Sequence, residues 1–430
     1  MLKKLRGNES DIELADIDLS DNQLRDAGGR LHGGPPIEHV FLLRAAELLH
    51  QYGTPAYRLE AVMTNVAQTL GVPSVILYTP TALVVAFGEG EAEKTYLRRV
   101  HSSDIDIAKL LQLDEILEQV EDGEFPLAEA MEEMEKAASA PSVFSIPFSA
   151  FASAVACSGI AVIFGGSLYD TAIAAIGGCL LFLVTVLLGS RGSGGWLEPF
   201  LGFSTAVSVA FVGQWLPIDE RLVTLAALIL PIPGLTLTVA ITELAVRHLS
   251  SGSARLAGAL VTLFTLVVGV AIGWRLTAGL GAGIEPLAAP LPEWSIWLVV
   301  AISPFAFSVV FKAPVSQWPY IAAVVVAGFL ANQAVGTVAG NEVAAFAGAF
   351  VVGCGSNAYA RLRNRPAMIP QTPGLLILVP GSVGYNSLTA MIDNETIRGV
   401  ELAFAMSITG VALVGGILLA NQVLSPRRSL

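Results

Sequence analysis

The sequence of 430 residues is 53% hydrophobic and only 14% charged, with a mean hydropathy of +0.65 and a formal net charge of −12. Soluble domains carry about 25% charged residues, so this composition excludes an ordinary soluble monomer. Residues 1–142 contain 25 acidic and 12 basic residues, whereas residues 143–430 contain 11 and 12. This division excludes a nucleic-acid binder with a basic stripe. It predicts an acidic N-terminal domain joined to a nearly neutral membrane domain.

The part of the chain before Pro141 is predicted to form a tail followed by a cytoplasmic α+β domain. Residues 1–36 are polar and end in Gly33-Gly34-Pro35-Pro36, a composition typical of a disordered segment. Residues 37–140 carry helix starts at Thr54-Pro55 and Ser102-Ser103, with β-type apolar runs between them. We expect helices over residues 37–51, 54–71, 104–120 and 126–138, and strands over 75–78, 82–87 and 95–100.

Beyond Pro141 the chain becomes a series of apolar stretches, each close to the ~20 residues needed to cross ~30 Å of hydrocarbon. The predicted fold class is an α-helical integral membrane protein with ten transmembrane helices. Five of them fall in residues 141–275 and five in residues 276–424, and residues 425–430 form a C-terminal tail. The expected spans are residues 144–164, 171–189, 199–215, 222–246, 256–274, 294–311, 319–337, 342–360, 367–391 and 399–420.

The basic residues test this topology, because they accumulate in cytoplasmic loops. With the N-terminal domain in the cytoplasm, nine basic residues fall on the cytoplasmic side and three on the opposite side. The asymmetry requires an even number of spans, so it supports ten and places both termini in the cytoplasm. The cytoplasmic residues are Arg191, Arg247, Arg255, Lys312, Arg361, Arg363, Arg365, Arg427 and Arg428, and the opposite ones are Arg221, Arg275 and Arg398.

Two of the expected spans contain helix breakers in related places. Pro231-Ile-Pro233-Gly234 interrupts the fourth span, and Pro370-Gln-Thr-Pro373-Gly374 interrupts the ninth. Proline removes a backbone N–H and glycine permits open backbone, so the freed polar groups must face protein or water rather than lipid. Five spans is an odd number, so the two sets are expected to lie in opposite orientations. Paired breaks in inverted repeats point to the binding site of a transporter.

The alternative is that the prolines only kink two packed helices. The matched positions favour a substrate site instead, in which the carboxylate of a zwitterion faces the N–H groups of a half-helix that begins near Gly234 or Gly374. The candidate substrate-binding residues are the breaks and the polar groups close to them in sequence: Pro233, Gly234, Thr236, Thr238, Pro373, Gly374, Leu375 and Asn386.

Two carboxylates inside the spans are candidates for proton coupling. Glu243 lies nine residues after Gly234, about 14 Å further along the same helix. A carboxylate buried in a membrane is costly and suggests a proton relay or a substrate contact. The alternative for Glu243 is a local pair with Arg247 at i+4. For Glu401 a local pair with Arg398 is the favoured interpretation.

Signatures of enzymes are sparse. The sequence contains no P-loop, HExxH or GxSxG motif, which favours a secondary transporter over an ATP-driven pump. Neither the three cysteines nor the five histidines form a metal-ligand spacing, so no metal or cofactor is expected. The run His101-Ser-Ser-Asp104 leaves a membrane-tethered hydrolase as an alternative, although a helix cap beside a surface histidine is the favoured interpretation.

Three motifs in the N-terminal region carry a resemblance: Gly53-Thr-Pro-Ala-Tyr-Arg58-Leu-Glu60, Tyr78-Thr-Pro-Thr81 and Arg99-Val-His-Ser-Ser-Asp104-Ile-Asp106. With them, the chain from Ile37 to Leu424 resembles the threonine/serine exporter (ThrE) family. The resemblance implies export of small amino acids, above all threonine and serine, across the inner membrane and driven by protons. It also implies a dicarboxylate exporter as an alternative, and it is compatible with a homo-oligomer.

The same resemblance marks Arg58, Glu60, His101 and Asp104 as motif positions of the N-terminal domain, for which an architectural role is the favoured interpretation. The acidic domain is expected to face the basic side of the membrane domain, and we expect it to dock there through Arg361, Arg363 and Arg365.

Overall fold

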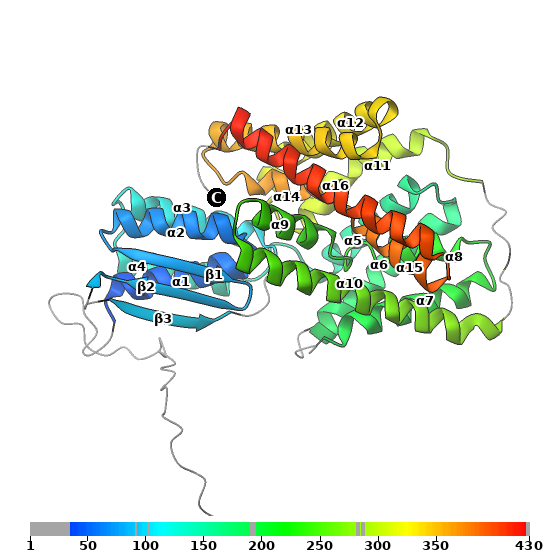
Figure 1. Ribbon diagram of the computed structural model, residues 1–430, viewed down its shortest axis with the longest axis horizontal. Helices are drawn as coiled ribbons and strands as arrows, with labels where there is room; N and C mark the ends of the chain where they lie inside the picture. Colours follow the sequence, from blue (N-terminus) through cyan, green and yellow to red (C-terminus); the bar gives the residue numbers. More distant parts are fainter. Residues whose placement is uncertain are drawn as a thin grey trace, which may run out of the picture.

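The computed structural model describes residues 35–90, 93–100, 104–189, 195–280, 284 and 289–426. Residues 1–34 and 427–430, which belong to the expected tails, lie outside these ranges, and so do His101, Ser102 and Ser103. Within the described ranges the chain forms two parts side by side (Figure 1). A mixed helix-and-sheet unit, here called the N-terminal domain, packs against a larger all-helical part, here called the membrane domain.

The N-terminal domain has the predicted order of helices and strands. The largest difference from an expected boundary is in the third helix, which begins at Ile107 rather than near Asp104, because the Asp106 carboxylate accepts a hydrogen bond from the Lys109 N–H at 3.1 Å and caps the helix there. The elements are α1 (Ile37–Gln51), α2 (Ala56–Thr69), β1 (Ser74–Thr79), β2 (Ala82–Phe87), β3 (Lys94–Arg99), α3 (Ile107–Glu121) and α4 (Leu127–Ser139).

The three strands form an antiparallel sheet in the order β1-β2-β3, with Thr79 paired to Ala82 across the first turn. Alternate side chains of β2 point inward and are buried in a core shared with α1 and α2. The opposite face of the sheet exposes Val75, Leu77 and Leu97. The helices therefore cover one face of the sheet only, and the core of the N-terminal domain lies between that face and the helices.

Among the described residues the membrane domain contains seven segments that are long and apolar enough to cross a bilayer, and three of the ten expected spans correspond to shorter apolar helices. The chain is therefore an α-helical membrane protein, and the ten-span topology stays a prediction. The helices are α5 (Ile146–Ile163), α6 (Leu168–Gly189), α7 (Leu197–Gly213), α8 (Glu220–Ala227), α9 (Gly234–Ala245), α10 (Leu249–Thr277), α11 (Trp294–Val310), α12 (Trp318–Ala339), α13 (Asn341–Arg363), α14 (Met368–Leu376), α15 (Gly381–Ile392) and α16 (Thr396–Val423).

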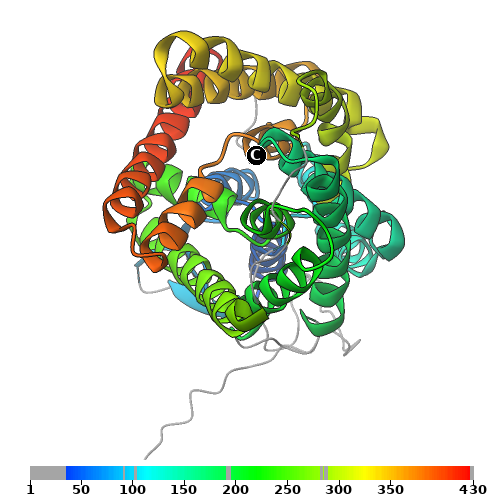
Figure 2. The ribbon, with the colours of Figure 1, turned by 90° about the vertical axis from the view of Figure 1, so that its right-hand side faces the viewer.

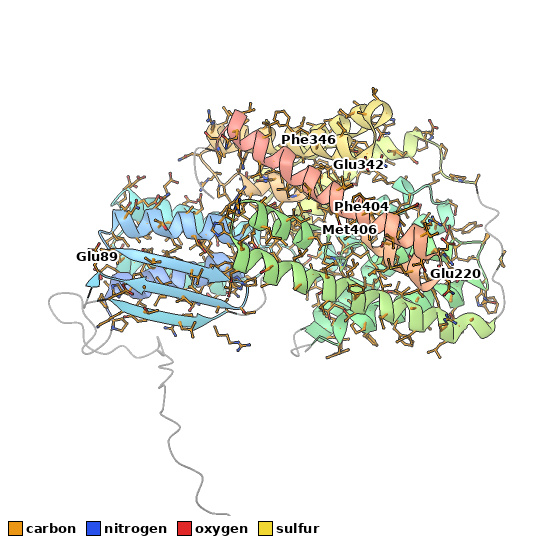
Figure 3. The ribbon with its side chains drawn as sticks, viewed as in Figure 1. Glu89, Glu220, Glu342, Phe346, Phe404 and Met406 are labelled. Atoms are coloured by element: carbon orange, nitrogen blue, oxygen red, sulfur yellow. The ribbon has the colours of Figure 1, made fainter. Side chains whose placement is uncertain are left out.

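Two helices, α10 and α16, are the longest, with 29 and 28 residues, and each is about 40 Å long. Seen end-on, the longer helices surround short green and orange ones that come from the broken spans (Figure 2). The molecule is elongated from the sheet to the far end of the membrane domain, so that Glu89 and Glu220 lie at opposite ends (Figure 3).

The first helix break lies where the sequence predicts it. Residues 228–233 interrupt the chain between α8 and α9, and α9 begins at Gly234 directly after Pro233. Because α9 is only 12 residues long, it extends about 18 Å and reaches only part of the way across a bilayer.

The predicted position of the second break is wrong. Pro370, Pro373 and Gly374 all lie inside α14, and the interruption is at residues 377–380. Pro370 takes the third helical position, where a backbone N–H has no partner within the helix anyway, so the helix starts without penalty. Gly374 serves packing: a Cβ atom there would lie 2.8 Å from the Val352 side chain of α13.

When the second break is placed at residues 377–380, equivalent residues of the two broken spans are separated by the same number of positions in the sequence. Gly234 and Gly381 are the first residues of α9 and α15, and both helices have 12 residues. Arg247 and Asn394, which follow these helices and are separated by the same offset, both have positive φ, at 71° and 65°. The chain therefore enters and leaves the two half-helices with the same backbone geometry.

The first residues of the two half-helices touch each other. A Cβ atom on Gly234 would lie 3.2 Å from the Gly381 Cα atom, and a Cβ atom on Gly381 would lie 3.0 Å from the Gly234 Cα atom. Real Cβ atoms rarely approach so closely, so only glycine permits this backbone-to-backbone crossing of α9 and α15. Each half-helix also packs on the long helix that follows the other, α9 on α16 and α15 on α10.

We expect Gly234→Ala and Gly381→Ala each to lower the free energy of unfolding by about 1–3 kcal/mol, because the added methyl group overpacks the crossing. Thermal unfolding of the purified protein in detergent measures the effect. Gly258→Ala is the matched control, since a Cβ atom on Gly258 meets nothing within 4 Å and alanine favours the helix. Equal melting temperatures for all three variants would contradict the crossing.

Candidate functional site

The N-terminal domain is held on the membrane domain by an apolar contact with ion pairs around it. Ile107 and Leu111 of α3 belong to the same buried cluster as Phe307 and Phe311, at the end of α11. The Ile107 N–H donates a hydrogen bond to the Phe311 carbonyl at 3.0 Å. The two parts therefore share a continuous core rather than a wet surface contact.

Two ion pairs beside this apolar contact involve one predicted motif residue and one of the three predicted docking arginines. Lys312 Nζ lies 2.7 Å from Asp104 Oδ2, and Arg365 Nη1 lies 3.4 Å from Glu115 Oε2. Docking through Arg365 is confirmed. Docking through the other two is wrong, because Arg361 donates to the Ser425 carbonyl and Arg363 stacks on the Tyr320 ring.

Glu243 joins the membrane domain to the first turn of α2. Its side chain is fully buried, and Oε1 accepts a hydrogen bond from the Ala56 N–H at 2.9 Å. Oε2 accepts from Ser251 Oγ at 2.9 Å and from Arg255 Nε at 3.2 Å, both on α10. A carboxylate at a helix N-terminus is stabilised by the free N–H groups and the helix dipole. Glu243 thus caps α2 across the domain boundary and forms a buried ion pair.

The predicted local pair of Glu243 with Arg247 is wrong. Helix α9 ends at Ala245, and Arg247 adopts the left-handed conformation with φ 71°. The i+4 geometry of a helix is therefore lost before Arg247, and Arg255, in the first turns of α10, takes its place.

Further ionisable groups from the N-terminal domain surround this ion pair. The His50 ring hydrogen-bonds the Tyr78 hydroxyl, and Tyr78 is buried beside Arg255. Burial raises the pKa of Tyr78 to about 12, although Arg255 acts in the opposite direction. Tyr78 therefore stays protonated and serves as a hydrogen-bonding group between the sheet and α10.

Glu60 completes the cluster on α2. Its Oε1 accepts a hydrogen bond from the Tyr78 N–H at 3.1 Å, and its Oε2 lies 3.4 Å from His248 Nδ1. Burial raises the pKa of Glu60 above its ordinary value of 4.5, and the charge of Glu243 raises it further, while the Tyr78 N–H and His248 lower it. Two carboxylates, Glu60 and Glu243, thus meet where α2 rests on the loop between α9 and α10.

Beside this cluster, a cavity of about 50 Å³ lies between the N-terminal domain and the membrane domain. By this measure a water molecule needs about 10–15 Å³, so the cavity holds only a few water-sized groups. The N-terminal domain contributes residues of the α1–α2 turn, Tyr57 and Arg58 of α2, and Ile105, while α9, α14 and α16 line the rest. The lining residues are Gly53, Pro55, Tyr57, Arg58, Ile105, Leu235, Thr238, Val239, Thr242, Met368, Gln371, Thr372, Leu375 and Ile417.

Arg58 is 6% exposed, and two of its three guanidinium nitrogens have partners. Nη2 donates to Gln371 Oε1 of α14 at 2.5 Å, and Nε lies 3.3 Å from the Tyr57 hydroxyl. Among the described residues Nη1 has no hydrogen-bond partner, and no carboxylate lies within ion-pair distance of Arg58. Arg58 is therefore a buried cation at the wall of the cavity.

Only part of the predicted substrate-binding set lies at this cavity. Thr238 and Leu375 line it, whereas Pro233 and Gly234 lie at the helix crossing and Thr236 is half-buried on α9. Pro373 and Gly374 lie within α14. Asn386 is exposed on α15 and does not line the cavity.

The remaining candidates are placed as follows. Glu401 is exposed on α16, and its predicted partner Arg398 binds Glu395 instead, at 3.0 Å. His101 lies outside the described residues. Asp104 binds Lys312 rather than a catalytic partner.

Sequence reasoning did not find Arg255, Ser251, Thr242 or Gln371. Arg255 and Ser251 reach Glu243 through the tight turn between α9 and α10, which no helical spacing predicts. Gln371 offered a signal, because it is an amide inside an apolar stretch, between Pro370 and Pro373.

The geometry defines a class of protein, an α-helical membrane protein with two crossing half-helices and a cavity under an N-terminal domain. Two family profiles match the chain: "Putative threonine/serine exporter" over residues 40–277 and "Threonine/Serine exporter, ThrE" over residues 297–423. The first alone covers more than half of the chain, so the chain belongs to the threonine/serine exporter (ThrE) family.

The sequence identity between the chain and individual relatives is low. The chain is 24% identical over 407 residues to a "Probable threonine/serine exporter" of Mycobacterium tuberculosis, covering 90% of this chain and 76% of the relative. It is 25% identical over 378 residues to an uncharacterized protein of Schizosaccharomyces pombe, covering 83% and 49%. It is also 25% identical over 385 residues to "Pheromone-regulated membrane protein 10" of Zygosaccharomyces rouxii, covering 84% and 39%. The chain thus spans half or less of these two fungal relatives. No solved structure matches it.

The raised pKa of Glu60 gives a pH prediction. The folded protein binds the Glu60 proton more tightly than the unfolded chain, so this residue stabilises the fold below pH 4.5, and that contribution is lost as the pH rises through the raised value. Because Glu60→Gln mimics the protonated form, we expect this variant to melt above the wild type at pH 7. The difference should shrink toward zero as the pH falls to 4.5.

The measurement is thermal unfolding in detergent across this pH range, with Glu124→Gln, an exposed carboxylate of the turn before α4, as the control. A difference between Glu60→Gln and wild type that grows as the pH falls would contradict the sign of the shift.

Proposed function

We propose that the protein is a secondary active exporter of small amino acids, threonine and serine, that works by alternating access of two inverted halves. The observation that carries this proposal is the glycine crossing of α9 and α15, since half-helices that meet inside a helical bundle form the substrate sites of many transporters. The family and the name of the Mycobacterium relative support the substrate class.

The two halves are proposed to be residues 141–275 and 276–424, each with five spans. The sequence offset from Gly234 to Gly381 equals that from Arg247 to Asn394, which supports this division. The reciprocal packing of α9 on α16 and of α15 on α10 supports it as well, because exchanging the two halves maps one contact onto the other.

We place the N-terminal domain and both termini on the cytoplasmic side of the inner membrane. Arg255, Lys312 and Arg365 contact or adjoin the N-terminal domain, whereas Arg221, in α8, and Arg398, in α16, lie at the opposite end of the membrane domain. The positive-inside rule then assigns the end with the N-terminal domain to the cytoplasm. A homo-oligomer remains a prediction.

Glu243 is the proposed proton-coupling residue, whereas Glu401 is exposed and does not line the cavity. A proton on Glu243 removes the ion pair with Arg255 and weakens the cap on α2. The groups that face Glu243 from neighbouring elements are Arg255 and Ser251 on α10, and Glu60 and Tyr78 on the N-terminal domain. Loss of charge on Glu243 thus weakens the contact of the N-terminal domain with the membrane domain. The cavity between them then opens to the cytoplasm.

A dicarboxylate remains the alternative substrate, because the cavity presents a cation rather than a second anion. The hydrolase alternative gains no support, since Asp104 is engaged by Lys312 in the part of the chain that the structure describes.

We expect Glu243→Gln to export labelled threonine from inverted vesicles at a rate that no longer responds to an imposed proton gradient. Glutamine retains an oxygen for the Ala56 N–H but cannot exchange a proton or pair with Arg255. Glu342→Gln, an exposed carboxylate in the first turn of α13 (Figure 3), is the control and should respond as the wild type does. Export by Glu243→Gln with unchanged dependence on the gradient would remove the coupling role.

A further inference from the structure

Arg58 is the buried cation of the interface that lacks an anionic partner among the described residues. In the same region Glu243 binds Arg255 and Glu60 lies beside His248, so both nearby carboxylates have other partners. Taking a charge out of water costs several kcal/mol unless a counter-charge or enough hydrogen bonds replace the water. Arg58 has partners for Nη2 and Nε, and Nη1 is buried without one in the part of the chain that the structure describes. Its guanidinium is therefore incompletely satisfied.

The position of Arg58 in α2 adds to this cost. The helix begins at Ala56, so Arg58 takes the third helical position, close to the positive end of the helix dipole. Basic residues are unfavourable in the first turn, where acidic ones are preferred. The Glu243 carboxylate that caps Ala56 offsets part of this positive charge, and a negatively charged group bound in front of Arg58 pairs with its Nη1 atom.

The cavity in front of Arg58 has room for a carboxylate group, and a whole amino acid needs it to widen by separation of α2 from α9 and α14. Thr238 and Thr242 of α9 and Gln371 and Thr372 of α14 provide hydroxyl and amide groups, each less than a tenth exposed. The remaining lining is largely aliphatic, from residues such as Leu235, Leu375 and Ile417. Arginine binds carboxylates with two parallel hydrogen bonds, and Nη1 together with Nη2 offers that fork if the Gln371 amide turns away.

We propose that Arg58 binds the carboxylate of the transported molecule, so that the substrate site is shared between the N-terminal domain and the membrane domain. This inference rests on the proposed export function and adds to it a substrate-binding residue, Arg58, that lies outside the membrane helices. The carboxylate accepts hydrogen bonds from Arg58, and the rest of the molecule lies against the hydroxyl groups of α9 and α14. A substrate then holds the two parts together, and its release frees α2 from the membrane domain.

The location of the site follows from the turn that precedes α2. Gly53 has φ +87°, and a Cβ atom there would lie 2.8 Å from the Ile105 side chain. The tight turn at Gly53 lets Thr54-Pro55 start α2 against α9, so that Arg58 reaches Gln371. The motif residues Gly53 and Arg58 therefore act together: the glycine positions the helix and the arginine supplies the charge.

Binding to the purified full-length protein in detergent tests the proposal by calorimetry. The probes are L-threonine, L-serine, succinate and L-threoninol, which has the threonine side chain but no carboxylate. We expect the wild type to bind at least one of the carboxylates and not L-threoninol. Arg58→Gln should weaken that binding roughly ten- to hundredfold, the range expected for loss of a charged hydrogen-bond partner. Arg58→Lys should recover part of the affinity, because it restores the charge without the fork.

The matched control is Arg98→Gln, an arginine of β3 that pairs with Glu47 away from the cavity, and it should bind as the wild type does. Equal affinity of wild type and a folded Arg58→Gln variant overturns the proposal. If that variant does not fold, equal binding of L-threonine and L-threoninol by the wild type overturns it instead. Tight carboxylate binding that depends on Arg58, without export of any of the three carboxylates from vesicles, supports the site and refutes the export function. Export that is unchanged in Arg58→Gln supports the export function and refutes the carboxylate site at Arg58.

Discussion

The crossing of α9 and α15 at Gly234 and Gly381 is the constraint on which the membrane domain depends. Both helices start inside the bundle, where lipid cannot satisfy free backbone groups, so other protein segments must enclose them. The long helices α10 and α16 do this, each following one half-helix and packing on the other. A side chain at either glycine would force these four helices apart, because the contact is made by main-chain atoms on both sides.

From this crossing, α9 leads directly to the N-terminal domain. The Thr238 and Thr242 side chains line the cavity, and Glu243, one residue further, caps α2. A single short helix thus connects the centre of the membrane domain with the first turn of a helix in another domain. Because the Glu243 carboxylate is shared by Ala56, Ser251 and Arg255, a shift of α9 along its axis changes hydrogen bonds in both domains at once.

Composition and periodicity predicted the element order of the N-terminal domain, the membrane class and the first break at Pro233-Gly234, since these depend on local signals. The second break was misplaced, because Pro370-Gln-Thr-Pro373-Gly374, with its two prolines, resembles Pro231-Ile-Pro233-Gly234 more closely than Pro380-Gly381 does. Helix α14 tolerates Pro370 at its third position and continues through Pro373, and Gly374 is required by the side chain of Val352. The partners of Glu243 could not be predicted, because they come together only when the domains dock.

The two half-helices have the same backbone but different chemistry. When Gly234 is aligned with Gly381, the position of Thr238 is taken by Tyr385, a buried aromatic side chain, and the position of Glu243 is taken by Ala390. At these two positions α9 therefore carries a small hydroxyl group and a carboxylate, whereas α15 carries a bulky aromatic ring and a methyl group. The two half-helices thus share one backbone path but present different side chains, so the correspondence between them is one of geometry and not of chemistry.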